Sequence, residues 1–276
     1  MKGLLMVCRR LWSWLLNMAE DDFMPLSDMI YSGRGITVGM TPEGNSFIGY
    51  TLTGRSLSSQ ARELVYDAEN QVIRTSVTDK KQLEKGSPAL LIYPAIAFGG
   101  GGLVASNGAQ TRLIYSESRK FSTPSRALSN AFEFPSFDYD AKEGWIDITN
   151  FEPDAPNNTP RINAFLREDE AAMHIARKLH PSGRDSFACN FRLNPGEGRL
   201  ITTYKGGNEK PLLPFDSEPL EVKVGSNNIG QIVGSLYEAI EGGQNQGDDY
   251  RVAAAVMMLR DGEPEVAIRN KSDLVI

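Results

Sequence analysis

The sequence predicts an α+β fold with largely antiparallel sheets. Short runs of β-forming residues are separated by turn residues over most of the chain, as in the expected hairpins 35–40 with 47–54 and 250–260 with 265–270. Helical patterns lie between such runs, but not in the strict strand–helix–strand order of a parallel doubly wound sheet. With 276 residues, 41% of them hydrophobic, the chain is long enough to bury one large core.

The first half of the chain is expected to consist mainly of strands. Residues 41–45, with the sequence TPEGN, form the turn of the first hairpin. A second hairpin is expected within 63–77, with its turn at 67–70, and further strands at 89–98 and 103–108. These elements predict a meander in which strands that follow one another along the chain pair.

The second half mixes helices with strands. A Thr-Pro start signal predicts a helix over 123–134. Acidic residues at the start and basic residues near the end predict a second helix over 168–183. Strands are expected at 185–193 and 199–206. In 228–241 apolar residues recur on one helical face and two glycines follow, which predicts a third helix.

We expect an N-terminal extension over 1–29 and a single domain over 30–276. The stretch 1–23 is basic and apolar, but it is too short to span a bilayer and no A-x-A cleavage pattern follows it. We interpret it as the product of a start codon assigned too far upstream, with later candidates at Met18, Met24 and Met29. The region 134–145 is the part of the chain that most resembles a linker between domains, but its aromatic residues lead us to expect that it is packed.

Charge and composition exclude several function classes. A formal net charge of -6 argues against a general nucleic-acid binder. The two cysteines, Cys8 and Cys189, lie in different contexts, so neither a disulfide framework nor a zinc ribbon is expected, and a reducing cytoplasm fits. His174 and His180 are six residues apart in the expected helix 168–183 without metal-ligand spacing, so no metal site is expected.

Four consecutive glycines, Gly99–Gly102, suggest either a phosphate-binding loop or a tight turn. The Lys and Ser/Thr of a Walker loop are missing and the next residues are again β-forming, so we favour a strand-to-strand turn, at an edge of the binding pocket. Asn107 and Gly108 follow the returning strand. An asparagine there offers a ligand both a donor and an acceptor, although Asn-Gly is also a common turn pair, and both alternatives stay open.

Three further polar clusters are ambiguous when each is taken alone. Arg55 and Ser56 in 53–62 suit phosphate binding or a surface loop. The stretch 151–166 contains a carboxylate, amides, a hydroxyl and an arginine around two prolines, which also suits a rigid connection. The stretch 195–207 places Tyr204 at the end of a strand after a glycine-rich turn.

Together and in this order, YSGRGITVGM, TGRSLSSQAR, VASNGAQT, NNTPRI and GEGRLITTYKG resemble the ordered signatures of the archaeal-type IMP cyclohydrolase family. The resemblance covers the chain from about Tyr31 onwards. It implies a four-layer αββα sandwich similar to the N-terminal-nucleophile (Ntn) hydrolases, without a processed N-terminal nucleophile. The implied reaction is the last step of de novo purine synthesis, in which 5-formamidoimidazole-4-carboxamide ribotide closes its ring and loses water to give IMP.

The resemblance also implies partners. The substrate attacks its own formyl group, so the chemistry requires positioning and proton transfer but no metal or organic cofactor. We expect a metal-independent cytoplasmic enzyme whose partner is a small purine ribotide rather than nucleic acid or a membrane. The sequence leaves a homo-oligomer open.

Site residues are assigned under this resemblance. Arg55 and Arg161 are the leading contacts for the phosphate or carboxamide, and Arg34 is a weaker third. Glu152 is the candidate for proton transfer, and Tyr93 or Tyr204 for a phenolic donor. The catalytic set is Arg55, Glu152 and Tyr93, and the substrate-binding set is Arg34, Ser56, Asn107, Gly108, Asn158, Thr159, Arg161 and Tyr204.

One position departs from the family pattern. Archaeal members tend to have Asn-Pro-Tyr where this chain has Tyr93, Pro94 and Ala95, so the expected tyrosine is replaced. The first alternative function is therefore a protein of the same fold that binds a purine nucleotide or ribotide without catalysis. The second is an Ntn-type amidohydrolase, which would need a nucleophile at its mature N-terminus.

Overall fold

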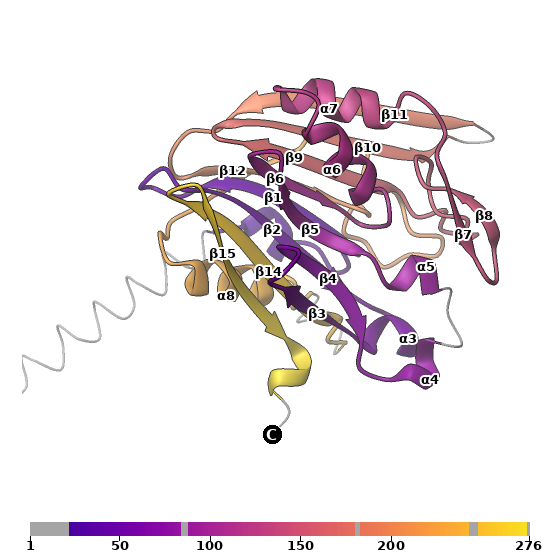
Figure 1. Cartoon of the computed structure of the whole chain (residues 1–276). Helices are drawn as coiled ribbons and strands as arrows, with labels where there is room; N and C mark the ends of the chain where they lie inside the picture. The colour runs from indigo at the N-terminus through magenta and orange to yellow at the C-terminus, as the bar shows by residue number, and fades with distance from the viewer. Residues whose placement is uncertain (1–21, 84–87, 180–182, 243–247, 275–276) are drawn as a thin grey trace, which may run out of the picture.

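Two antiparallel sheets form the centre of the molecule (Figure 1). The computed structural model describes residues 22–83, 88–179, 183–242 and 248–274. One sheet contains, in spatial order, β13 (Leu220–Lys223), β12 (Glu197–Thr202), β1 (Arg34–Met40), β2 (Ser46–Thr53), β14 (Arg251–Arg260) and β15 (Glu263–Asn270). The other contains β11 (Arg184–Arg192), β10 (Glu170–Lys178), β9 (Arg161–Arg167), β6 (Gly102–Ser106), β5 (Pro94–Gly99), β4 (Val72–Val77) and β3 (Arg62–Asp67).

Helices cover the outer face of each sheet, which gives four layers in the order αββα (Figure 1). The helix α8 (Ile229–Ala239) packs on β14, β15 and β2 of the six-stranded sheet. On the seven-stranded sheet lie α6 (Thr111–Ser118) and α7 (Pro124–Ala131). The predicted α+β fold with antiparallel sheets is confirmed.

The central strands are buried on both faces because helices cover the outer face of each sheet and the other sheet covers its inner face. In β14, Ala253, Ala255 and Met257 pack between the sheets, whereas Val256 and Met258 pack under α8. This two-residue alternation follows from the strand geometry, in which successive side chains point to opposite faces. A continuous apolar run therefore marks a doubly covered strand.

Shorter elements connect the layers. They are α2 (Met24–Ser27), α3 (Leu57–Gln60), α4 (Lys80–Leu83), α5 (Pro88–Leu91) and the 3-10 turn η1 (Lys271–Leu274). The strand predicted over 89–98 therefore begins with a helical turn and becomes extended only at Pro94. The helix α6 was not predicted from the sequence.

The helix predicted over 168–183 is wrong, because Glu170–Lys178 forms the strand β10. Met173 and Ile175 face the core between the sheets and Ala172 faces α7, so the apolar run reflects burial on two faces. His174 accordingly lies in a strand. His180 lies outside the described residues.

The region 134–145 is also different from the prediction. It forms most of the hairpin of β7 (Phe137–Asp140) and β8 (Gly144–Asp147), beside the two main sheets (Figure 1). Within the described ranges, one face of this hairpin is covered, through Ile146 and Ile148. The aromatic side chains are exposed rather than packed, by 59–72%, at Phe134, Phe137, Tyr139 and Trp145.

The interpretation of Gly99–Gly102 as a strand-to-strand turn is confirmed. Gly99 pairs with Gly102, and Gly100 and Gly101 form the two-residue loop with φ angles of 61° and 76°. Hairpin turns of this length favour positive φ at both positions, which glycine adopts without steric cost.

The segment that precedes β1 packs on the domain. Phe23 and Leu26 are fully buried in the cluster under α8, so the predicted boundary after residue 29 falls within packed chain. The rest of the expected extension, with Cys8 and Met18, lies outside the described residues. Across the ranges that the structure describes, no helix combines the length and the apolar character needed to cross a membrane.

Candidate active site

A buried carboxylate between two arginines joins the ends of the two sheets. Arg34 begins β1 in one sheet, Arg161 begins β9 in the other, and Glu152 lies in the loop that follows β8. Arg161 Nη1 donates to Glu152 Oε1 at 2.9 Å, and Arg34 Nη2 donates to the same oxygen. Glu152 is 3% exposed and Arg161 1%. We call Arg34, Glu152 and Arg161 the buried triad.

The triad carries one more positive than negative charge. Burial lowers the pKa of Arg161, and the charge of Arg34 adds to this effect while Glu152 opposes it. Burial also acts against the charge of Arg34, but Glu152 and neighbouring phenols outweigh it and hold the pKa of Arg34 above its usual value; the phenols are those of Tyr93, Tyr50 and Tyr204. Arginine stays protonated in proteins, so both guanidinium groups can bind an anionic or developing oxyanionic group.

Asn107 connects the end of β6 to the triad. Its side chain is fully buried: Nδ2 donates to the carbonyl of Pro160 at 2.7 Å, and Oδ1 accepts from the backbone N–H of Ile162 at 3.0 Å. Arg34 Nη2 donates to the backbone carbonyl of Asn107 at 3.5 Å. These bonds place Asn107 beside both arginines of the triad.

Gly108 lies directly against Arg161. A Cβ atom at Gly108 would overlap the guanidinium, with Cζ at 3.1 Å, and would lie 2.6 Å from Gln110 Oε1. Only a residue without a side chain allows this approach. Gln110 was not among the predicted site residues, although it belongs to the quoted motif VASNGAQT and lies three residues after Asn107.

Two pairs of hydroxyl groups lie near the triad. Tyr50 and Tyr93, both buried between the sheets, share a hydrogen bond of 3.0 Å between their hydroxyls. The hydroxyl of Tyr204 lies 2.6 Å from that of Thr159, which in turn donates to Asp154 Oδ2 at 2.5 Å.

The same surroundings shift the acidity of these groups. Burial, and next the neighbouring Tyr93, raise the pKa of Tyr50. Burial raises the pKa of Tyr204 as well. For Asp154, burial and then the charge of Glu152 raise the pKa. The phenols of Tyr50 and Tyr204 therefore remain protonated at neutral pH and can donate hydrogen bonds.

The remaining predicted residues lie farther out. Arg55 packs over the ring of Tyr31, with Cζ 4.7 Å from its centroid, and Tyr31 stacks on Tyr204 at 5.7 Å. Arg55 thus contacts an aromatic ring that itself stacks on the ring of Tyr204. Ser56 caps α3, and Asn158 donates to the carbonyl of Pro156 in its own loop. A role of Arg55, Ser56 and Asn158 in substrate binding stays a prediction.

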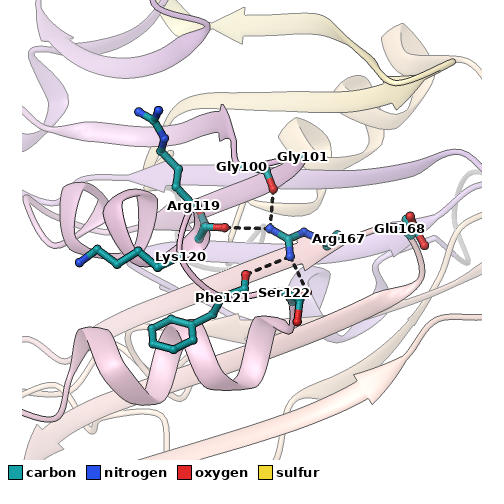
Figure 2. A pocket seen from close by; sticks show the side chains of 9 residues that line it. Gly100, Gly101, Arg119, Lys120, Phe121, Ser122, Arg167 and Glu168 are labelled. Carbon is teal, nitrogen blue, oxygen red and sulfur yellow. Dashed lines mark hydrogen bonds between the residues drawn. The ribbon is translucent and has the colours of Figure 1, made fainter.

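The glycine turn lies away from this site. Asn107 follows one end of β6 and the turn lies at the other, and five strand residues span about 17 Å. A hollow beside Gly100 and Gly101 contains Arg167, whose guanidinium donates to four backbone carbonyls around the end of α6 (Figure 2); they belong to Gly100, Ser118, Phe121 and Ser122. Arg167 thus fixes the end of α6, and the turn lies at the opposite end of β6 from Asn107, so its place at an edge of the binding pocket stays a prediction.

Comparisons with known proteins agree with this picture. The family model described as "IMP cyclohydrolase-like protein" matches residues 31–263, which is most of the chain. Three of the similar curated proteins are named IMP cyclohydrolase and come from strains of Methanococcus maripaludis. Strain C7 gives 26% identity over 180 residues and strain C6 28% over 180, each covering 65% of this chain and 77% of the relative. Strain S2 gives 28% over 145 residues, 52% of this chain and 62% of the relative.

The matched region contains every residue of the buried triad, together with Asn107, Gly108 and Tyr204. The identities are low, but the family model covers far more than half of the sequence. The chain therefore belongs to the family of IMP cyclohydrolase-like proteins.

Proposed function

We propose that this protein is an IMP cyclohydrolase that closes the ring of 5-formamidoimidazole-4-carboxamide ribotide to IMP with loss of water. It would thus be a hydrolase of carbon–nitrogen bonds in cyclic amidines, and we expect it to act in the cytoplasm. The observation that carries the proposal is the buried triad beside Asn107 and Gly108, within the region that the family model matches. The relatives named IMP cyclohydrolase support it.

The proposed reaction requires two proton movements. The carboxamide nitrogen bonds to the formyl carbon, and one of its protons goes to the formyl oxygen, which becomes a hydroxyl group. That hydroxyl then leaves as water while the formamido nitrogen gives up its proton and forms the C=N bond of the new ring. The enzyme must hold both groups in contact, stabilise the developing oxyanion and relay protons.

The triad has groups suited to each task. Arg34 and Arg161 offer N–H donors to the formyl or carboxamide oxygen or to the phosphate. Both bind Oε1 of Glu152, so the other carboxylate oxygen is not held by them, and we assign proton transfer to it. The phenols of Tyr93 and Tyr204 are the candidate hydroxyl donors near this carboxylate, and Arg55 is the outer candidate for the phosphate.

A turnover assay tests this proposal. The purified full chain is mixed with the formylated ribotide, and IMP formation is followed by absorbance. Glu152→Gln is expected to reduce turnover by about 10²-fold or more, because proton transfer by a positioned group contributes about that much. Glu263→Gln, at an exposed position in β15, is the matched control and is expected to retain wild-type turnover. Unchanged turnover in Glu152→Gln would remove the carboxylate from the mechanism.

One observation favours a second candidate function. Ala95 is fully buried in β5, so this position contributes no phenol to the site. A protein that retains the arginines but lacks a required donor would bind a purine nucleotide or ribotide without converting it. Binding of the formylated ribotide by calorimetry, with no IMP detected in the same sample, would favour this candidate over the enzyme.

A further inference from the structure

The side-chain amide of Gln110 has an orientation that the backbone imposes. Asn107 Oδ1 accepts the N–H of Ile162, and its Nδ2 donates to the carbonyl of Pro160, so the Asn107 amide can face only one way. Gln110 Nε2 donates to that same Oδ1 at 3.0 Å. Because an amide has its donor and its acceptor on opposite arms, Gln110 must turn Oε1 away from Asn107.

This oxygen is buried without a partner. Gln110 is 0% exposed, and within the described part of the chain no group donates a hydrogen bond to Oε1. Buried polar atoms are almost always satisfied by protein, water or a ligand, so an exception at a functional site needs an explanation. Over the same described ranges, Arg34 Nε is a buried donor that also lacks an acceptor. The site thus offers one free acceptor and one free donor.

The free acceptor lies at the triad. A Cβ at Gly108 would lie 2.6 Å from Gln110 Oε1 and 3.1 Å from Arg161 Cζ, so both groups surround the same point. The arginines supply donors, which attract the oxygens of a ligand. The acceptor oxygen of Gln110 among these donors instead attracts a hydrogen-bond donor of the ligand, an N–H or an O–H.

We propose that Gln110 Oε1 accepts a hydrogen bond from the carboxamide nitrogen of the ribotide, the atom that attacks the formyl carbon; this inference rests on the proposed function. That nitrogen starts with two hydrogens and becomes the ring N1 of the product, where it retains one. A contact to the retained hydrogen can persist from substrate to product. The formamido N–H cannot serve in this way, because its hydrogen is lost on ring closure.

The contact makes Gln110 a specificity-determining residue. A hypoxanthine nucleotide has an N1–H that satisfies Oε1. An adenine nucleotide has an unprotonated N1, so two acceptors would face each other and the buried Oε1 would stay unpaired. Sites built to hydrogen-bond a ligand reject analogues that lack the matching group far more strongly than apolar pockets do.

The test compares the affinities of IMP and AMP, which share the phosphate and the ribose, by calorimetry. The wild-type protein is expected to bind IMP at least about tenfold more tightly than AMP. In Gln110→Met, which has a similar shape but no acceptor, this preference is expected to fall by about tenfold or more. Asn270→Leu removes a buried amide that bonds the backbone of Leu64, and it is the control for general destabilisation, with an unchanged preference.

The outcomes separate the two proposals. If Gln110→Met weakens the binding of IMP and of AMP equally, this inference is overturned, because that result would point to a ribose contact or to packing alone. Equal affinity of the wild-type protein for the two nucleotides would overturn it without any variant. Turnover of the ribotide by the wild-type protein in either case would leave the proposed function intact. Failure of the wild-type protein to bind IMP or form it would overturn the proposed function and this inference together.

Discussion

Gly108→Ala places one methyl group against the guanidinium of Arg161. The added Cβ would overlap the guanidinium. It would also lie 2.6 Å from Gln110 Oε1, which is much shorter than an ordinary contact of 3.4–4 Å. Gly108 does not have a left-handed φ, so the substitution adds no backbone strain and acts through this overlap alone. Arg161 is 1% exposed and bonded to Glu152, so it can move only by disturbing the triad.

The expected magnitudes follow from that displacement. Overpacking of a buried site costs about 1–3 kcal/mol of the free energy of unfolding. Loss of the ion pair between Arg161 and Glu152 would raise the cost to about 3–5 kcal/mol. For activity, a misplacement of about 1 Å in a catalytic site reduces the rate by about 10²-fold.

Two assays measure these effects: kcat/KM for IMP formation and unfolding in urea. Gly234→Ala is the matched control: apart from its own helix, the nearest described atom that its Cβ would meet is Arg269 Nη1 at 3.8 Å, and alanine in a helix is favoured by about 1 kcal/mol. If Gly108→Ala keeps kcat/KM within about twofold of wild type and unfolds at the same urea concentration, the placement of Gly108 on Arg161 is refuted.

Three further predictions address other parts of the structure. Glu152→Gln leaves two buried guanidinium groups without their carboxylate and is expected to lower the free energy of unfolding by about 3–5 kcal/mol; a urea midpoint equal to that of Glu263→Gln would contradict this. Burial, and then Arg184, lower the pKa of His174 to about 3. Because the unfolded state binds this proton from about pH 6.5 downwards, stability should fall as the pH drops from about 6.5 towards 3. The free energy of unfolding in urea should differ less between pH 4.5 and pH 7 in His174→Gln than in the wild-type protein. An unchanged difference would argue against His174 as the source of the pH dependence. Gly99→Ala would bring a Cβ within 2.8 Å of Tyr115 Cζ and should cost about 1–3 kcal/mol in urea unfolding without changing KM, because the turn lies away from the triad; a raised KM would contradict that separation.

Elements with strong local signals could be predicted from the sequence. Asp261 and Gly262 both adopt positive φ in the turn between β14 and β15, as their residue types favour. The apolar face and the following glycines marked α8, and Thr123 with Pro124 marked α7. In these cases the residues that determine the element lie within it or directly beside it.

Elements that depend on distant packing could not be predicted in this way. The apolar run of β10 was mistaken for a helix because burial on both faces removes the two-residue alternation of a strand. The aromatic residues of β7 and β8 were expected to be packed, but alternation places Phe137, Tyr139 and Trp145 together on the uncovered face. Both errors concern which faces other elements cover.

In the candidate site, too, some features follow from local sequence signals and others only from the packing of distant segments. The motifs indicated Arg34, Asn107 and Arg161, and Glu152 was indicated by its position before NNTPRI. Only the fold brings the ends of β1, β6 and β9 and the loop after β8 into contact. Gln110 lies within the motif VASNGAQT, but its residue type alone did not single it out. Its importance follows from the fixed amide of Asn107, which is a property of the hydrogen-bond network.

The most direct test of this account is a crystal structure of the protein with IMP bound. The purine is expected at the buried triad, with N1–H on Gln110 Oε1 and an oxygen of the nucleotide on Arg34 or Arg161. IMP bound at a place that none of these three side chains touches would contradict both the proposed site and the role of Gln110.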